Sequence, residues 1–197
     1  MLRDKSFIKG TVTAKVYGPD GNLKYFDGHP LLRGLPLSVQ MVFEKLFSIT
    51  AHRPMIVINH NIVTNEGDAL VADQMANTPA KTKVDTTNGY IEVGTGFTSE
   101  SKSTLSCATP TGSPEVMDAT YPKVKGAFGA ADDNVTQYRS TFEAGDLNAT
   151  GIDEAALINN AVAASADCLA YAQITPSVNV TTSDTLEVTW ELTYLGS

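Results

Sequence analysis

The sequence predicts a mainly β protein: a β-sandwich or jelly-roll-like domain with one or two short helices and an N-terminal arm. The final residues, TSDTLEVTWELTYLGS, alternate apolar and polar side chains, as in a strand with one buried and one wet face. Charged residues make up only 18% of the chain, and the polar remainder is rich in Thr, Ser and Asn. Short segments of strand character follow one another between Gly, Pro, Asn and Asp turns, which favours a sandwich over alternating strands and helices.

Length and charge restrict the classes of function. A chain of 197 residues is long enough for one domain with a hydrophobic core. The net charge of −8 and the lack of a basic run argue against nucleic-acid binding. No run approaches 18 apolar residues, and the start, MLRDKSFIKGTV, has no apolar signal core. We therefore expect a protein made in cytoplasm that neither crosses a membrane nor carries a leader.

The N-terminal region reads as a hairpin arm. Thr11–Tyr17 alternates, the next five residues are typical of a turn, and Leu23–Phe26 returns. An arm of this kind can add a strand to a neighbour's sheet. We expect residues 1–54 to form the arm and a helix, and residues 55–197 to form the core domain. Removal of residues 1–28 should then leave a folded protein.

A short amphipathic helix is expected before residue 48. Its apolar residues recur at helical spacing, and Ser38 is placed to cap its start. These residues are Leu35, Val39, Val42, Phe43, Leu46 and Phe47. We expect the helix to pack on its own domain; the alternative is that it presents its apolar face to another subunit.

The remaining elements follow from the same patterns. A helix is expected from about Glu66 to Met75, with Asn65 as its cap. The stretch between residues 98 and 126 is polar and rich in Pro and Gly, and predicts an extended loop with at most a short strand. GIDEAALIN is ambiguous. Strands are expected at Met55–Ile58, Asn59–Val63, GYIEVGTG, NVTQYRSTFEAG, CLAYAQI and Leu186–Leu195.

No spacing in the chain identifies a catalytic, cofactor or metal site. VGTGFTSES has Ser99 where a dinucleotide fingerprint needs its third glycine. DLNATGIDE places Asp146, Asn148, Thr150, Gly151 and Asp153 at positions 1, 3, 5, 6 and 8 of a calcium-loop-like pattern, but Leu157 stands at position 12, where the bidentate Glu belongs. Whether Asp146–Glu154 binds calcium in another geometry stays open. Cys107 and Cys168 fit no zinc or redox spacing, and are expected to be small buried residues, with a disulfide as the alternative.

Four segments, in order, resemble a group of tailed-bacteriophage virion proteins. They are NHNIVTNEGDALVADQMA, YIEVGTG followed by STL, YRSTFEAGDLNATGIDEAALIN, and LAYAQITPSVNVTTSDTLEVTWELTYL. The resemblance covers about residues 57–195. Ala156 departs from the pattern, which has Gly there, and the region 30–54 is longer than the pattern predicts.

The resemblance implies a non-enzymatic virion protein, localised in the particle. We expect a decoration or cement protein on the head surface, with a tail, collar or baseplate component as the alternative. Its partners would be other virion proteins and further copies of itself. The expected contact residues are Lys5, Phe7, Val12, Val16, Tyr17 and Tyr25 on the arm, and Val39, Phe43 and Phe47 on the helix.

A receptor- or carbohydrate-binding β-sandwich is a further alternative. It requires aromatic side chains exposed together on one face of the domain. The candidates are Tyr90, Tyr121, Tyr138 and Tyr171.

Overall fold

A computed structural model describes residues 7–32, 34–47, 49, 51–162 and 165–195. Its helices are the 3-10 turn η1 (Pro30–Leu32), α1 (Leu37–Phe47) and α2 (Asn65–Gln74). Its strands are β1 (Phe7–Tyr17), β2 (Ile56–Val63), β3 (Tyr90–Gly94), β4 (Glu115–Val116), β5 (Lys123–Val124), β6 (Val135–Phe142), β7 (Ala149–Ile158), β8 (Cys168–Val180) and β9 (Thr185–Leu195). Across these described residues the strands form one antiparallel sheet, in the order β4-β3-β7-β8-β2-β1-β9-β6-β5. The mainly β, sandwich-like fold is confirmed.

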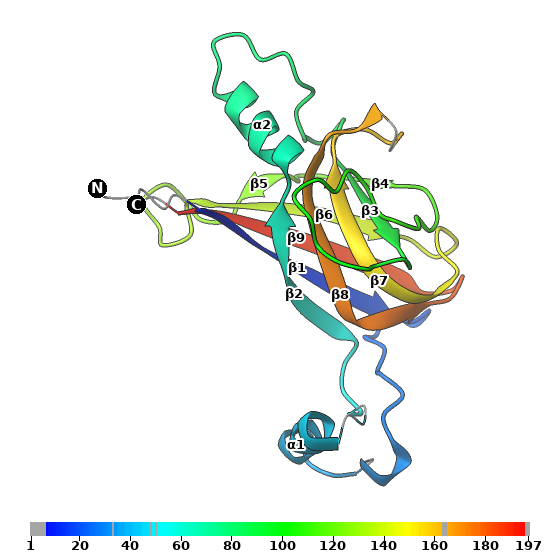
Figure 1. The fold of residues 1–197 in the computed structure, drawn as a ribbon. Coiled ribbons are helices and arrows are strands. Elements are labelled where there is room, and N and C mark those ends of the chain that lie inside the picture. Colours follow the sequence, from blue (N-terminus) through cyan, green and yellow to red (C-terminus); the bar gives the residue numbers. More distant parts are fainter. Residues whose placement is uncertain (1–6, 33, 48, 50, 163–164, 196–197) are drawn as a thin grey trace.

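The sheet curls until its two ends meet (Figure 1). The residues after β4 join both ends, because the Met117 N–H donates to the Gly89 carbonyl beside β3 (3.1 Å), and the Asp118 N–H donates to the Arg139 carbonyl of β6 (2.8 Å). The Ser140 hydroxyl of β6 adds a hydrogen bond to the Glu115 carbonyl (3.1 Å). Since β4 and β5 are only two residues each, little unpaired strand edge is left to pair with another chain.

The main hydrophobic core fills the inside of the curl. The inward residues of β9 are Leu186, Val188, Trp190 and Leu192, all fully buried, as their alternation predicts. Each buried Leu or Val stabilises the fold by roughly 1.5–3 kcal/mol. The apolar face of the closing strand is therefore a main source of the stability of the curl.

A second, smaller core lies outside the curl, under the loop of residues 95–112. It is built from Cys107, Ala156, Ile158, Cys168 and Tyr171. The second half of β7 is therefore buried on both faces, as its burial pattern records. This explains why GIDEAALIN is ambiguous in sequence, since a strand buried on both faces shows no alternation.

The prediction of an N-terminal arm is wrong for β1. This strand lies inside the sheet and pairs with β2 on one side and β9 on the other. Val12 and Val16 are buried in the core, so residues 1–54 do not stand apart from the domain. Leu23 makes only a single bridge to Tyr17. The alternation of β1 correctly predicts a strand, but the partners of this strand are β2 and β9 rather than the residues just after the next turn.

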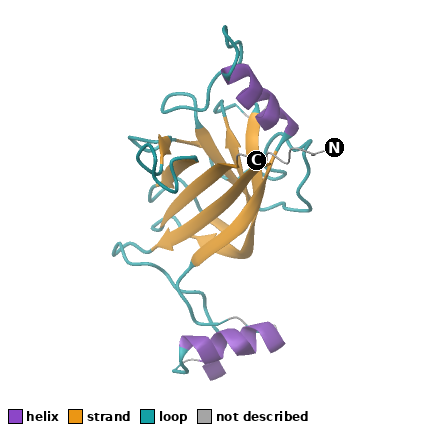
Figure 2. Cartoon of the chain, turned by 90° about the vertical axis from the view of Figure 1, so that its left-hand side faces the viewer, coloured by secondary structure: helices purple, strands orange, loops and turns teal. Residues whose placement is uncertain are grey.

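Helix α1 is the part of the chain that does stand apart. It lies below the curled sheet in Figure 1, in the long connection between β1 and β2 (Figures 1 and 2). Most of its apolar residues are exposed, so the expectation that it packs on its own domain is wrong. The alternative, an apolar face free for another subunit, agrees with this position.

Three element boundaries differ from the sequence expectation. The cap of α2 is Thr64, whose hydroxyl accepts from the Gly67 N–H (3.0 Å), because Asn65 is already helical. The two expected strands at Met55–Val63 are one strand, β2. Strand β8 continues through Pro176, because its pairing with β7 is interrupted by bulges there and no ladder N–H is missed.

These corrections make opposite predictions for two deletions. Deleting residues 1–17 removes a central strand, and the chain should no longer fold. Replacing residues 29–51 with a short Gly-Ser linker removes α1 but keeps every strand, so the protein should remain folded. Circular dichroism and thermal melting of both variants test this. A cooperative melt after deletion of residues 1–17 would contradict the position of β1.

Candidate interaction surface

Residues 27–53, here called the projecting segment, leave and re-enter the sheet at one point. The two chain legs pair there: the Phe26 N–H donates to the Arg53 carbonyl (3.0 Å), and the Met55 N–H donates to the Lys24 carbonyl (2.7 Å). The Tyr25 ring stacks on His52, with 5.1 Å between ring centroids. The base of the projecting segment is thus held by backbone hydrogen bonds and ring packing.

The two legs approach so closely that a glycine is needed. A Cβ atom at Gly28 would lie 2.3 Å from the His52 nitrogen, a contact that no side chain tolerates. Beside it, the Arg53 guanidinium lies 4.8 Å from the centroid of the Phe26 ring. Its Nε is 3.5 Å from the Glu44 carboxylate on α1. The base of the segment is therefore a packed structure that links α1 to the sheet.

Gln40 fixes the orientation of α1. It is the one residue of this helix that is buried. Its side-chain Nε2 donates to the Leu35 carbonyl (2.8 Å), and its Oε1 accepts from the His52 N–H (2.8 Å). Both bonds join the helix to its own segment, so the side that carries Gln40 and Glu44 faces inward and the other sides are free.

Two opposite flanks of α1 are apolar and exposed. The first, here called flank A, consists of Val39, Val42, Phe43 and Leu46, which follow the i, i+3, i+4, i+7 spacing of one helical stripe. The second, flank B, consists of Leu37 and Met41. At 100° per residue the two flanks lie on opposite sides of the helix. Leu46 is 69% exposed and Met41 is 53% exposed.

The expected contact residues fall into distinct places. Val12 and Val16 line the core, so they cannot meet a partner, and their assignment as contacts is wrong. Tyr17 is half-buried at the end of β1, and Tyr25 is exposed at the base of the projecting segment. Phe7 begins β1, and Lys5 lies outside the described residues. Val39, Phe43 and Phe47 are exposed on α1.

A polar hollow of about 330 Å³ lies on the outer face of β1, β9 and β6. Each of its charged side chains forms an ion pair, either within the hollow or with a neighbouring residue. Lys15 contacts Glu187 (2.8 Å), and Arg139 contacts Asp118 (2.5 Å). The hydrogen bond to Glu187 raises the pKa of Lys15. These ion pairs brace the outer face of the sheet.

The aromatic residues proposed for glycan binding are not exposed together. Tyr121, Tyr138 and Tyr171 are buried, and Tyr90 is half-buried. Lys123 and Arg139 each lie 4.6 Å from the centroid of the Tyr121 ring, so this ring is engaged by cations of its own chain. The requirement of the glycan-binding alternative is therefore not met by these four residues.

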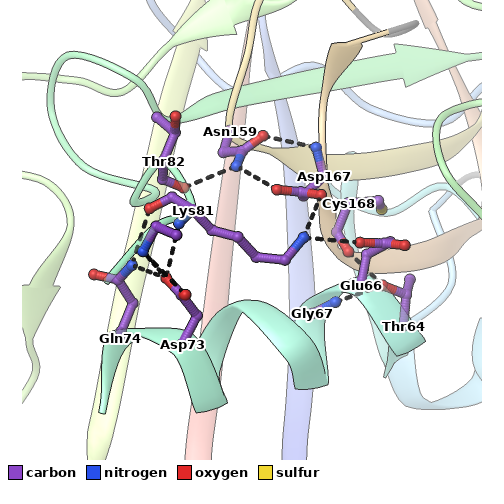
Figure 3. A network of polar contacts seen from close by, with 11 residues as sticks. Thr64, Glu66, Gly67, Asp73, Gln74, Lys81, Thr82, Asn159, Asp167 and Cys168 are labelled. Atoms are coloured by element: carbon purple, nitrogen blue, oxygen red, sulfur yellow. Dashed lines mark hydrogen bonds and ion pairs between the residues drawn. The ribbon is translucent and has the colours of Figure 1, made fainter. Parts of the chain in front are cut away.

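A second polar network fastens α2 and the loop after it to the β7–β8 hairpin (Figure 3). The Lys81 ammonium contacts Asp167 (2.9 Å) and Glu66 (3.2 Å). Asn159 donates to the Asp167 carboxylate (3.0 Å) and accepts from the Asp167 N–H (2.7 Å). Partial burial acts to raise the pKa of Asp167, but the hydrogen bonds from Lys81 and Asn159 outweigh it and lower the pKa. The network positions α2 and supplies no free acid or base.

The most deeply buried carboxylate, Glu154 on β7, holds the loop of residues 95–112 onto the sheet. Its Oε1 accepts from the N–H groups of Gly96 (3.1 Å) and Thr109 (2.9 Å). Its Oε2 accepts from the Ala108 N–H (2.9 Å) and from the Tyr171 hydroxyl. Four donors converge on one fully buried side chain, so Glu154 acts as a structural clamp for the loop.

Glu92 adds a second attachment of the same loop, and the two cysteines pack beside it in the smaller core. The Glu92 carboxylate accepts from the Cys107 N–H (2.7 Å), and burial raises its pKa. Cys107 and Cys168 are free, buried thiols, which confirms the expectation of two small buried residues. Burial raises the pKa of Cys168 to about 12 and raises that of Cys107 well above its usual value. Thiols in this state are poor nucleophiles.

The Asp146–Glu154 segment is not folded as a calcium-binding loop. From Ala149 onward it is an extended strand, and its side chains serve separate contacts. The Asp146 carboxylate accepts from the Glu143 N–H (2.7 Å), and the Asp153 carboxylate accepts from the Phe97 N–H (3.1 Å). Among the described residues, no group of three or more His, Cys, Asp or Glu side chains is placed to hold a metal ion.

Comparison with protein-family models, with curated proteins and with solved structures finds no match to this chain. Neither α1, α2 nor any other helix among the described residues has the length and apolar character needed to span a bilayer. The candidate surface thus rests on the geometry of α1 itself.

The Glu154 clamp yields a direct prediction. Glu154→Gln puts an amide donor either where two N–H groups donate (Gly96 and Thr109) or where an N–H group and a hydroxyl donate (Ala108 and Tyr171). At about 1–3 kcal/mol for each buried donor left without an acceptor, we expect a loss of roughly 2–6 kcal/mol in the free energy of unfolding. Tyr171→Phe removes only one of the four donors and serves as the matched control, with a loss of about 1–2 kcal/mol. Urea denaturation measures both. Equal stability of Glu154→Gln and the wild type would show that the clamp does not stabilise the loop.

Proposed function

We propose that this chain is a non-enzymatic structural component of a tailed-phage virion, and that it joins the particle as a decoration protein of the head. The observation that carries the proposal is α1, an apolar helix held away from the sheet by the packed base of the projecting segment. Large apolar surfaces exposed on a soluble domain mark sites of protein association. The resemblance of residues 57–195 to phage virion proteins is the reason for proposing a virion as the assembly that this chain joins.

The chemistry of the body supports a structural role. Its buried carboxylates, Glu92 and Glu154, hold loop backbone in place, and the charges of the outer hollow form ion pairs. Buried polar side chains whose hydrogen bonds are all satisfied make the sheet rigid and fix the positions of the loops that they bind. A rigid body with one projecting apolar element suits a protein that works by docking.

The projecting segment also accounts for a departure from the phage pattern. The region 30–54 is longer than the pattern predicts, and it contains η1 and α1. The rest of the sheet closes without it, because the legs of the segment pair at its base. We therefore assign docking to the added region and scaffolding to the sheet.

Particle incorporation tests the proposal. In virions of the phage that encodes this chain, mass spectrometry of gradient-purified particles should detect the protein, and immunogold labelling should mark heads. A chain with residues 29–51 replaced by a Gly-Ser linker should be absent from particles, whereas Phe128→Glu, at an exposed site outside the segment, should be incorporated normally. Purified particles that lack the wild-type chain would refute the virion role, and label confined to tails would refute the head assignment.

A further inference from the structure

We infer that α1 docks onto α1 of further copies of this chain, with flank A of one copy against flank B of the next, so that the copies close into a ring or bundle. The inference names the partner of the docking helix and so rests on the proposed function. It follows from the distribution of apolar residues around α1, from the area they expose and from the charge of the projecting segment.

The first argument is the number of apolar sides. A groove on a different protein covers one side of a helix, and its targets carry one apolar stripe. In α1 the stripe of flank A and the pair in flank B lie on opposite sides, separated by the inward Gln40 side and by the outward Ser38 and Lys45. A helix with two opposite apolar flanks is covered on both only when it has a neighbour on either side.

The second argument is area. The projecting segment exposes nine large apolar residues, which are Leu31, Leu35, Leu37, Val39, Met41, Val42, Phe43, Leu46 and Phe47. Taking about 200 Å² for each fully exposed side chain, their exposed fractions amount to roughly 900 Å². The largest apolar patch on a typical monomer is about 300–600 Å², whereas one partner of a standard interface contributes about 800 Å². On the same scale flank A exposes about 400 Å² and flank B about 200 Å², and Leu31, Leu35 and Phe47 supply the rest beside them. Each junction is therefore modest alone, and the junctions reinforce one another when a ring closes.

The third argument is charge. The projecting segment carries three basic and two acidic residues, a net charge of +1, so the rest of the chain carries −9. Copies that met through their sheets would bring together two bodies that each carry a net charge of −9. Copies that meet through α1 do so at the nearly neutral part of the chain. Figure 2 shows α1 set away from the sheet, so contact through this helix need not bring the acidic bodies together.

Such a junction is heterologous, since two different surfaces of the helix meet. Heterologous contacts close into a ring when the rotation between copies permits, and a ring needs at least three copies. The inference therefore specifies a mass of at least three times the 21.0 kDa of one chain. It also specifies that both flanks are required.

The test uses the full chain and light scattering coupled to size exclusion, over a concentration series. One double variant, Val42→Glu with Leu46→Lys, breaks flank A, and another, Leu37→Glu with Met41→Lys, breaks flank B. Each places Glu four residues before Lys, which preserves helix propensity and net charge. The control is Met75→Lys with Phe128→Glu, which changes two exposed apolar residues outside the projecting segment. Circular dichroism checks that all variants are folded.

We expect the wild type and the control to have at least three times the monomer mass, and both flank variants to run as monomers. A wild type that stays monomeric at the highest concentration overturns the inference. So does a flank B variant that keeps the wild-type mass, since flank A would then pair with itself. If the wild type is a monomer in solution and still enters particles through α1, the helix binds a different virion protein and not a second copy of this chain. A ring that is absent from particles would refute the virion role alone. Co-sedimentation of the monomer with phosphatidylglycerol vesicles would assign the flanks to lipid instead.

Discussion

The antiparallel pairing of β1 with β2 is the constraint on which the rest of the structure depends. Lys15 lies opposite Ile56, and the Val16 N–H donates to the Met55 carbonyl, so β1 ends where β2 begins. Whatever the chain does between these strands, it must leave and return at one point. The residues in between can therefore fold outward as a unit, and the close approach at Gly28 holds the two legs together. The opposite edge of β1 pairs with β9, whose apolar side chains fill the core.

The curled sheet with its loops, here called the body, and the projecting segment have different roles, because the body buries its apolar side chains and the projecting segment exposes most of them. In the body, apolar residues fill the curl and the small outer core, and buried polar groups such as Glu154 are matched by several donors. In the projecting segment only a few residues, among them Leu32, Gln40 and Ala51, are buried. Those few fix the helix in place without covering its flanks. A chain that gains stability from the sheet can keep an apolar helix exposed, at the cost of a tendency to associate.

The sequence predicts local structure here better than it predicts partners. The alternation in β9 and in β6 identifies both strands, and helical spacing identifies α1, because these signals come from neighbouring residues. The place of β1 in the sheet depends on pairing with residues between 168 and 188 positions away, which a turn at Gly18–Asn22 cannot reveal. Glu154 was missed for a similar reason: its donors come from a loop far along the chain. A Glu directly before the apolar run Ala155–Ile158 is the one local sign of it. The contacts expected on α1 did not depend on long-range pairing, and those residues are exposed in the structure.

Hydrogen–deuterium exchange tests the central claim, that the chain associates through α1 and not through its sheet. Exchange is measured by mass spectrometry on the wild-type chain, at high concentration and after strong dilution. The account predicts that amides of residues 37–47 exchange slowly in the concentrated sample and rapidly after dilution, while the strands keep the same rates in both. Equal rates for residues 37–47 at the two concentrations, or protection gained along the strands, would contradict it.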